Sequence, residues 1–304
     1  MLSLSESAVW LSSAASEVSS LQAAHYFRFK FSLKSPIAKA VLRYSALGVV
    51  EPWVNGLRVS DDFFTPGWSD YRKRAYVCSY EVGERLQIGD NCLGVVLADG
   101  WAGAPFGPKG HAVAFAPRAM FVAELEVIYV DGSREVISTT KDWHWRKGAI
   151  LKNSIYNGET YDARKAIPDW ASEVSSARGW KAVEVVPAPS IELTDKKCPP
   201  VRITEKREPI DLRLYKKLWI ADFGQNLVGV MCIQLRNTKP GQKIVLKFAE
   251  MLQSDGSLYT ENLRDAQATD VYYCKGGDEE SYMPRFTFHG FRYAQVEGYA
   301  GLEA

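Results

Sequence analysis

Short runs that alternate apolar and polar side chains constrain the fold of this chain more than any other feature of its sequence. The run Tyr26–Leu33 places apolar residues at every second position, and residues 38–46 repeat the pattern. A period of two is typical of a half-buried β-strand. Asn55 and Gly56 stand between apolar residues, which indicates a β-hairpin turn. Short strands at regular spacing, without a long helical period, predict an all-β fold of the β-sandwich or jelly-roll kind.

The length of the chain and one change in its composition suggest two domains. A chain of 304 residues exceeds one average domain. The clearest change in composition is the proline- and lysine-rich stretch at residues 187–200, so we place the domain boundary near residue 190. We therefore expect an N-terminal arm at residues 1–24, a jelly-roll-like β-sandwich at 25–190 and a second β-sandwich at 191–304.

The charge balance and the cysteines exclude several classes of protein. The chain has 37 Lys and Arg against 36 Asp and Glu, a net charge of +1, so no nucleic acid and no membrane surface is predicted as a partner. Its five cysteines form no Cys-x-x-Cys pair, which argues against a zinc site or a disulfide framework and favours a cytoplasmic location. Residues 1–6 lack the features of a signal peptide, and no apolar run approaches the length of a membrane span.

Two predicted loops between residues 61 and 103 carry the side chains best suited to bind a sugar. One loop holds Trp68 and Asp70, and the other holds Asp99 and Trp101. A flat indole face suits the apolar face of a sugar ring, and carboxylates accept hydrogen bonds from its hydroxyl groups. The alternative is that the tryptophans cap the core and the aspartates bond their own backbone. The candidate sugar-binding residues are therefore these four.

A polar and aromatic stretch at residues 153–164 holds a second group of charged side chains. Glu159 and Asp162 are candidates for a carboxylate pair. The interpretation that we favour is that they brace this loop or the two domains, together with Arg164.

His289 and Gly290 are predicted to form a turn that joins strands at residues 281–288 and 291–297. No orienting acid and no nucleophile motif lies near His289 in the sequence, so we favour a packed turn histidine over a catalytic base. No catalytic residue is predicted in this chain.

A series of short motifs, taken in order along nearly the whole chain, resembles bacterial α-L-rhamnosidases of glycoside hydrolase family seventy-eight. The motifs are Asn55-Gly56, Pro66-Gly67-Trp68, Asp99-Gly100-Trp101, and residues 156–164, 222–229, 259–264 and 288–293. The first half resembles the N-terminal module of that family, and the residues from 222 onwards resemble the start of its next domain.

The resemblance implies a rhamnose-binding jelly roll that in some relatives uses calcium. Its sugar and ion lie among the loops matching Asp70, Asp99 and Trp101, near a loop that resembles Asn-Leu-Tyr-Gly-Asp in those relatives. Here residues 113–117, at the end of a Gly- and Pro-rich loop, read Val-Ala-Phe-Ala-Pro. Calcium takes six to eight oxygen ligands, and this loop lacks the acid and the amide. We therefore predict no metal and no other cofactor, with calcium as the alternative.

The resemblance also implies a catalytic α/α barrel after the motif at residues 288–293, whose acidic catalytic motif is not found in this sequence. Two hypotheses follow. The first is an accessory, non-catalytic part of an α-L-rhamnosidase that binds rhamnose-containing carbohydrate or supports the catalytic barrel. The alternative is a structural module that docks a catalytic partner, or dimerises, without binding sugar. A self-sufficient hydrolase is the weakest reading, because no acid and base pair is visible.

Overall fold

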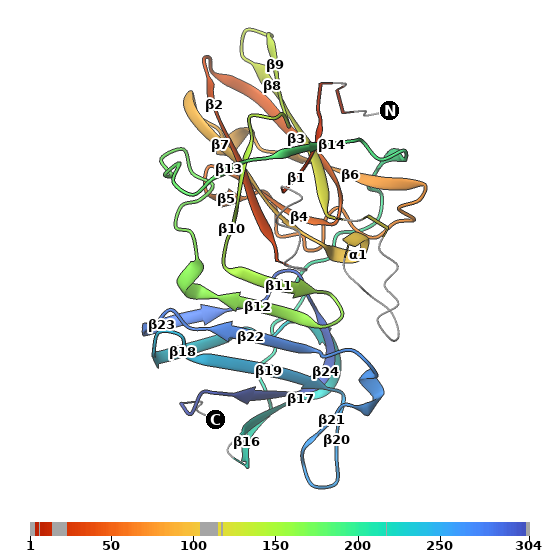
Figure 1. Ribbon diagram of the computed structural model, residues 1–304, viewed down its shortest axis with the longest axis vertical. Coiled ribbons are helices and arrows are strands. Elements are labelled where there is room, and N and C mark those ends of the chain that lie inside the picture. Colours follow the sequence, from red (N-terminus) through yellow and green to blue (C-terminus); the bar gives the residue numbers. More distant parts are fainter. Residues whose placement is uncertain are drawn as a thin grey trace. The chain divides into compact units, whose positions relative to one another are not determined.

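Strands dominate the computed structural model of this chain (Figure 1). The described residues are 4–5, 7–13, 23–103, 115–116, 118–216 and 218–301. Within them, helical structure is confined to α1 (Gly100–Gly103) and the single turns η2 (Gly83–Arg85), η4 (Ala163–Lys165) and η5 (Glu261–Leu263). None of these helices has the length and apolar character needed to span a membrane. The predicted all-β class is confirmed.

The described residues form two compact units. The first unit holds residues up to 103, together with 115–148 and 167–202, and the second holds 149–166 and 203–301. The boundary in the structure therefore differs from the one expected near residue 190. Residues 149–166, which we expected in the first domain, belong to the second unit.

The first unit contains two sheets. In one sheet the strand order is β14-β1-β8-β3-β6-β15, and β9 pairs with β8. These strands are β1 (Trp10–Ser12), β3 (Ile37–Leu47), β6 (Arg74–Glu81), β8 (Met120–Tyr129), β9 (Arg134–Ser138), β14 (Glu184–Val186) and β15 (Glu192–Asp195). In the other sheet the order is β13-β10-β2-β7-β4-β5. These strands are β2 (His25–Leu33), β4 (Val49–Val54), β5 (Leu57–Arg58), β7 (Gly89–Ala98), β10 (His144–Lys147) and β13 (Lys181–Ala182).

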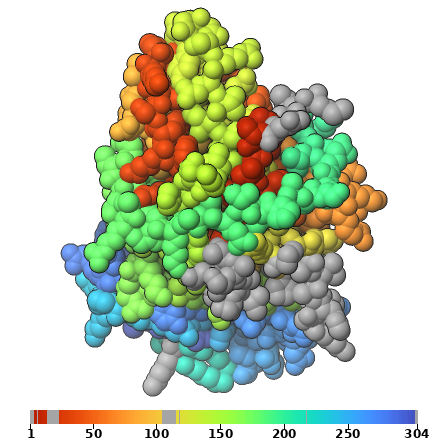
Figure 2. Space-filling view, turned by 45° about the horizontal axis from the view of Figure 1, so that its top comes forward, coloured from red at the N-terminus to blue at the C-terminus, as the bar shows by residue number. Residues whose placement is uncertain are grey.

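Local sequence signals explain much of the first unit. The predicted hairpin turn joins β4 to β5, and both Asn55 and Gly56 have the positive φ that such a turn requires. The expected N-terminal arm includes β1, which pairs with β14 and buries Trp10 and Leu11. Figure 2 shows this red segment beside the green segment that contains β14.

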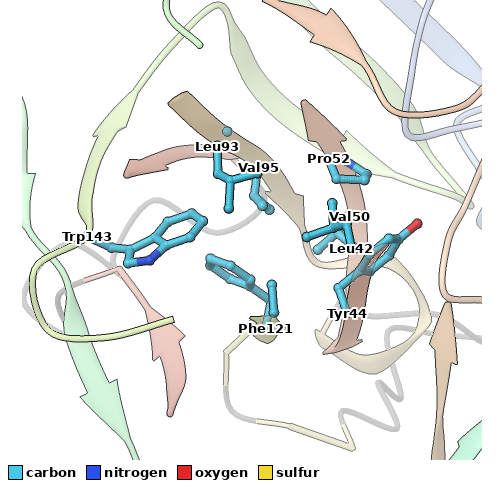
Figure 3. A pocket seen from close by; sticks show the side chains of 10 residues that line it. Leu42, Tyr44, Val50, Pro52, Leu93, Val95, Phe121 and Trp143 are labelled. Atoms are coloured by element: carbon cyan, nitrogen blue, oxygen red, sulfur yellow. The ribbon is translucent and has the colours of Figure 1, made fainter. Parts of the chain in front are cut away.

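The core of the first unit is formed by apolar side chains from both of its sheets. Phe27 on β2 meets Phe121 on β8 edge to face, with ring centroids 5.0 Å apart, and Trp143 lies 5.7 Å from Phe121. Phe121 and Trp143 are among the side chains, drawn in Figure 3, that line a small void with a volume of about 10 Å³. This is barely enough for one water molecule, so this void offers no room for a ligand.

The second unit is organised around one large sheet with the order β11-β12-β22-β19-β24-β17-β16. Its strands are β11 (Ile150–Ser154), β12 (Gly158–Asp162), β16 (Asp211–Tyr215), β17 (Leu218–Gly229), β19 (Lys243–Ala249), β22 (Thr269–Tyr273) and β24 (His289–Glu297). Two small pairs complete it, namely β18 (Ile233–Thr238) with β23 (Gly277–Tyr282) and β20 (Met251–Leu252) with β21 (Leu258–Tyr259).

Long-range strand pairing accounts for both differences from the sequence-based expectation. β12 pairs in parallel with β22, more than a hundred residues further on, which places β11 and β12 in the second unit. The turn predicted at His289 and Gly290 is wrong: both residues lie in β24, where His289 pairs with Gly229 of β17. β23 pairs instead with β18. A local pattern predicts a strand but does not identify its distant partner.

Candidate functional site

A glycine at the end of β7 sets the position of Trp101. Gly100 follows Asp99 and begins α1 with a φ of +53°. A Cβ atom at this position would lie 2.7 Å from the Cγ1 of Val49 and 3.0 Å from its backbone nitrogen. Only glycine avoids this clash and the left-handed backbone strain together. The chain therefore turns sharply here and carries Trp101 into the loop region.

Trp68 and Trp101, here called the tryptophan pair, lie together. Their rings stack with centroids 6.0 Å apart and planes inclined by 17°. Phe64 meets Trp101 edge to face at 5.8 Å. Trp68 is 53% exposed, whereas Trp101 is half-buried. The two tryptophans chosen from the sequence thus form one aromatic surface, of which Trp68 is the accessible part.

The described part of the Gly- and Pro-rich loop packs beside α1. The backbone N–H groups of Phe115 and Ala116 both donate to the carbonyl of Ala102, at 2.8 and 3.0 Å. Phe115 lies 5.5 Å from Tyr71, and Ala116 is buried in the same apolar cluster. The rest of the 104–117 loop lies outside the described residues. At positions 115 and 116, therefore, the side chains contribute apolar packing and no oxygen ligand.

In this region, the carboxylate of Asp99 remains able to accept hydrogen bonds from a ligand. Burial raises its pKa to about 6. Within the described ranges, its carboxylate forms no hydrogen bond or ion pair, although its backbone carbonyl accepts the N–H of Gly103 at 3.0 Å. A half-buried carboxylate without a partner can accept hydrogen bonds from the hydroxyl groups of a ligand.

Asp70 is engaged within its own turn. Its carboxylate accepts hydrogen bonds from the side chain and the backbone N–H of Arg72, at 2.9 and 3.2 Å. Its backbone carbonyl accepts the N–H groups of Lys73 and Arg74. The side-chain bond from Arg72 lowers the pKa of Asp70. These contacts correspond to the turn-stabilising role that the sequence left open as the alternative.

The described residues contain no group of three or more His, Cys, Asp or Glu side chains arranged to hold a metal ion. Phe115 and Ala116, the described residues of the loop at 104–117, have apolar side chains. Calcium takes six to eight oxygen ligands, and the expectation that the chain holds no calcium stays a prediction.

The other candidate residues belong to the second unit. Asp162 accepts two side-chain bonds from Arg164, at 2.8 and 2.9 Å, and caps η4 through the backbone N–H of the same arginine. Glu159 is buried and accepts the N–H groups of Arg285 and Phe286, at 3.1 and 3.2 Å. Burial, opposed by these N–H groups, raises the pKa of Glu159 to about 8. These partners all lie within the second unit, so the contacts brace its loops, and a role between domains stays a prediction.

Two features of these sites were missed by sequence reasoning. Phe64 packs against Trp101. It stands in the loop that had already been singled out from the sequence, and its aromatic side chain was the signal that could have found it. Asp270 lies 3.0 Å from His289, whereas no acid near that histidine was expected. These two residues are 19 positions apart in the sequence, and no local motif joins them.

Comparison with known proteins identifies the family. Residues 35–205 match the α-L-rhamnosidase N-terminal domain model, and residues 212–303 match the bacterial α-L-rhamnosidase concanavalin-like domain model. An α-L-rhamnosidase of Streptomyces avermitilis is 38% identical over 290 residues, which are 92% of this chain and 27% of that protein. One of Formosa agariphila is 36% identical over 276 residues, or 90% and 30%.

Solved structures agree with the sequence matches. The S. avermitilis α-L-rhamnosidase complexed with L-rhamnose superposes with a TM-score of 0.89 at 37% identity and covers 93% of this chain and 28% of that one. The Aspergillus terreus α-L-rhamnosidase gives a TM-score of 0.93 at 31% identity, with 97% and 34% covered. The chain thus spans about a third of the length of these relatives. It belongs to the bacterial α-L-rhamnosidase family, and comprises the N-terminal domain of that family followed by its concanavalin-like domain.

Proposed function

We propose that this chain is an accessory, non-catalytic part of an α-L-rhamnosidase that binds rhamnose-containing glycan at the tryptophan pair. The observation that carries this proposal is the stacking of Trp68 on Trp101, with Trp68 exposed. The carboxylate of Asp99, which forms no other bond among the described residues, is the acceptor on the same stretch of chain. A stacking surface with one acceptor suits a sugar ring.

The binding is expected to be weak and independent of calcium. Few polar groups are available, and each net hydrogen bond contributes about 1 kcal/mol. We therefore expect a dissociation constant on the order of 1 mM, which corresponds to about −4 kcal/mol. Asp70 supports the turn that carries Trp68 and is not needed as a direct ligand.

A catalytic barrel is the partner that we propose for the chain. The matched relatives are named α-L-rhamnosidases, and this chain spans 27–31% of their length. The remaining length is the expected source of the acid and base that hydrolysis requires. Docking to such a barrel without any sugar binding is the second candidate function, favoured by the ring packing that already involves half-buried Trp101. We also propose a cytoplasmic location, which suits the free thiols at all five cysteines.

The test is a titration of the purified chain with L-rhamnose, followed by calorimetry or NMR, first with calcium and then with a chelator. We expect millimolar binding in both cases, and an affinity that is several-fold lower in Trp68→Ala. Tight binding that the chelator abolishes would contradict the calcium-independent site. Absence of binding to L-rhamnose and to rhamnosylated oligosaccharides would leave docking as the function. Hydrolysis of an aryl α-L-rhamnoside by this chain alone would overturn the non-catalytic assignment.

A further inference from the structure

β16 is the last strand of the large sheet in the second unit, beside β17 (Figure 1). Among the described residues, no strand pairs with its other side. Such an edge presents backbone N–H and C=O groups that can bind a further strand. Addition of a strand to an open edge is a common mode of protein association. The side chains of β16 therefore decide which strand can join it.

One face of β16 carries apolar side chains to the edge of the sheet. Leu214 pairs with Trp219, which packs against the buried apolar cluster of the second unit, and residues paired in this way lie on the same side of a sheet. Leu212 lies on the same side as Leu214, because side chains alternate along a strand. Leu214 is 62% exposed, and Ile210, directly before β16, is 72% exposed. The apolar face of the sheet thus reaches an edge where these side chains remain open to solvent.

The opposite face of β16 carries two complementary charges. Oδ2 of Asp211 lies 4.0 Å from Nε of Arg213, and their side chains are 55% and 47% exposed. In an antiparallel pair of β16 strands related by a two-fold axis at Leu212, each Asp211 faces Arg213 of the other copy. An axis at Arg213 would instead place two arginines opposite each other, which is destabilising. The order of the charges therefore favours one register of self-pairing.

We propose that a second copy of this chain joins at β16, with its own β16 antiparallel and the two-fold axis at Leu212. Leu212 then faces Leu212 of the second copy, and Ile210 faces its Leu214, so each copy covers apolar surface of the other. The contact of Asp211 with Arg213 forms twice, since a two-fold interface repeats every contact. Charges on a sheet edge usually oppose association, but here their order makes the edge complementary to itself. The proposal goes beyond the proposed sugar binding and does not depend on it.

The dimer is tested by sedimentation velocity of the purified chain over a range of concentrations. An interface of one short strand is small, so we expect a dissociation constant on the order of 100 µM. The mass should rise from one chain below this concentration to two chains above it. A single chain at every concentration would overturn the proposal and leave this edge to another domain. Growth beyond two chains would also overturn it, because a two-fold interface closes at the dimer.

A charge swap tests the register. Asp211→Arg and Arg213→Asp should each weaken dimerisation about tenfold or more, since each places two like-charged pairs in the interface. The double variant Asp211→Arg with Arg213→Asp restores opposite charges in the same register and should recover the affinity to within about threefold. Single variants that dimerise as the unchanged chain does, or a double variant as weak as the single ones, would overturn the proposal.

A matched control separates this edge from a general effect of charge. Arg134→Asp makes the same reversal on β9 in the first unit, where the side chain is 68% exposed, and should leave dimerisation unchanged. Equal weakening by this variant would contradict the proposal. Thermal unfolding reports that each variant is folded. Trp68→Ala should not affect dimerisation, so failure of sugar binding and failure of the dimer are distinguishable.

Discussion

The imidazole Nε2 of His289 lies 3.0 Å from Oδ2 of Asp270, and both side chains are buried in the second unit. The ring of His289 also stacks on Phe248, with centroids 4.2 Å apart. The other carboxylate oxygen of Asp270 accepts the backbone N–H of Glu159 at 2.8 Å. Through its two oxygens, Asp270 therefore connects β22 to both β24 and β12.

Removal of the Asp270 carboxylate should be strongly destabilising. Asp270→Ala leaves the N–H of Glu159 and the ring of His289 without their acceptor in a buried place, and each buried group left unsatisfied costs about 1–3 kcal/mol. Asp270→Asn keeps one acceptor oxygen and should cost less. Urea unfolding monitored by tryptophan fluorescence measures both. A loss below about 1 kcal/mol for Asp270→Ala would contradict the connecting role.

Glu159 should make the stability of the chain depend on pH. Its pKa is raised to about 8 in the folded chain from an ordinary value of 4.5. The favourable contribution of its neutral form is therefore complete below about pH 4.5 and is lost as the pH rises through about 8. Linkage gives a decrease in the unfolding free energy of up to about 5 kcal/mol across this window. Glu159→Gln should flatten the profile, which equilibrium unfolding at several pH values measures.

Glu280 provides a control of opposite sign. Burial opposes its ionisation, yet bonds from Thr238, Tyr272 and two backbone N–H groups hold its pKa below the usual range. Its contribution is therefore present above the unfolded-state pKa and is lost as the pH falls. Glu280→Gln should reduce stability at neutral pH and leave in place the decrease that Glu159 causes between about pH 4.5 and about 8. Identical profiles for Glu159→Gln and Glu280→Gln would contradict the assignment.

The exposed tryptophan of the pair should matter for binding more than for folding. Trp68 is 53% exposed, so Trp68→Ala should lower L-rhamnose affinity several-fold while costing about 1 kcal/mol of stability or less. Val130→Ala is the control, because it also removes apolar surface from an exposed residue, which here lies in a turn and is 70% exposed. It should change neither the affinity for L-rhamnose nor the stability. Calorimetric titration and thermal unfolding give the two quantities. Unchanged affinity for L-rhamnose in Trp68→Ala would show that the sugar does not stack on Trp68.

Sugar binding should also respond to the ionisation of Asp99. Burial raises its pKa to about 6, and the charged carboxylate is the stronger acceptor. Affinity for L-rhamnose is therefore expected to rise as the pH increases from about 5 to about 7. Asp99→Asn should abolish this dependence, because its amide does not titrate in this range. A pH-dependent affinity that persists unchanged in the variant would show that another group is responsible.

Two arginine–aspartate pairs of the same geometry should differ in energy. Asp222 accepts bonds from Arg292 at 2.8 and 2.9 Å across β17 and β24, where the arginine side chain is 37% exposed. Asp70 and Arg72 form their pair within an exposed turn, where that arginine is 77% exposed. Double-mutant cycles should give a coupling of about 1 kcal/mol for the first pair and close to zero for the second. Equal couplings would show that exposure does not control these pairs.

Local signals in the sequence were sufficient for the fold class and for part of the site. The alternation at residues 26–33 and the Asn55-Gly56 turn report conformations that neighbours in sequence determine, and both are found as expected. The two tryptophans were singled out because each stands in a loop that flanks a predicted strand, and their role in sugar binding stays a prediction. The stacking of the two rings depends on the turn at Gly100 and could be recognised only in the structure.

Contacts between strands that are distant in the sequence could not be predicted from local sequence signals. Asp270 and His289 stand on β22 and β24, which are both neighbours of β19, so sheet order brings them together. The placement of β12 beside β22 follows from pairing across the chain as well. Periodicity defines which face of a strand is buried, but many partners satisfy the same pattern. The expected boundary near residue 190 therefore missed the early segment that the second unit incorporates.

That incorporation has a consequence for synthesis on the ribosome. Thr160 of β12 pairs with Val271 of β22, so the first strand emerges 111 residues before its neighbour. At about 5–20 residues per second, translation leaves the β11–β12 hairpin waiting for roughly 5–20 s with one edge unpaired. An unpaired edge is a template for wrong association. The nascent chain is therefore most vulnerable to aggregation after β12 has emerged and before β22 arrives.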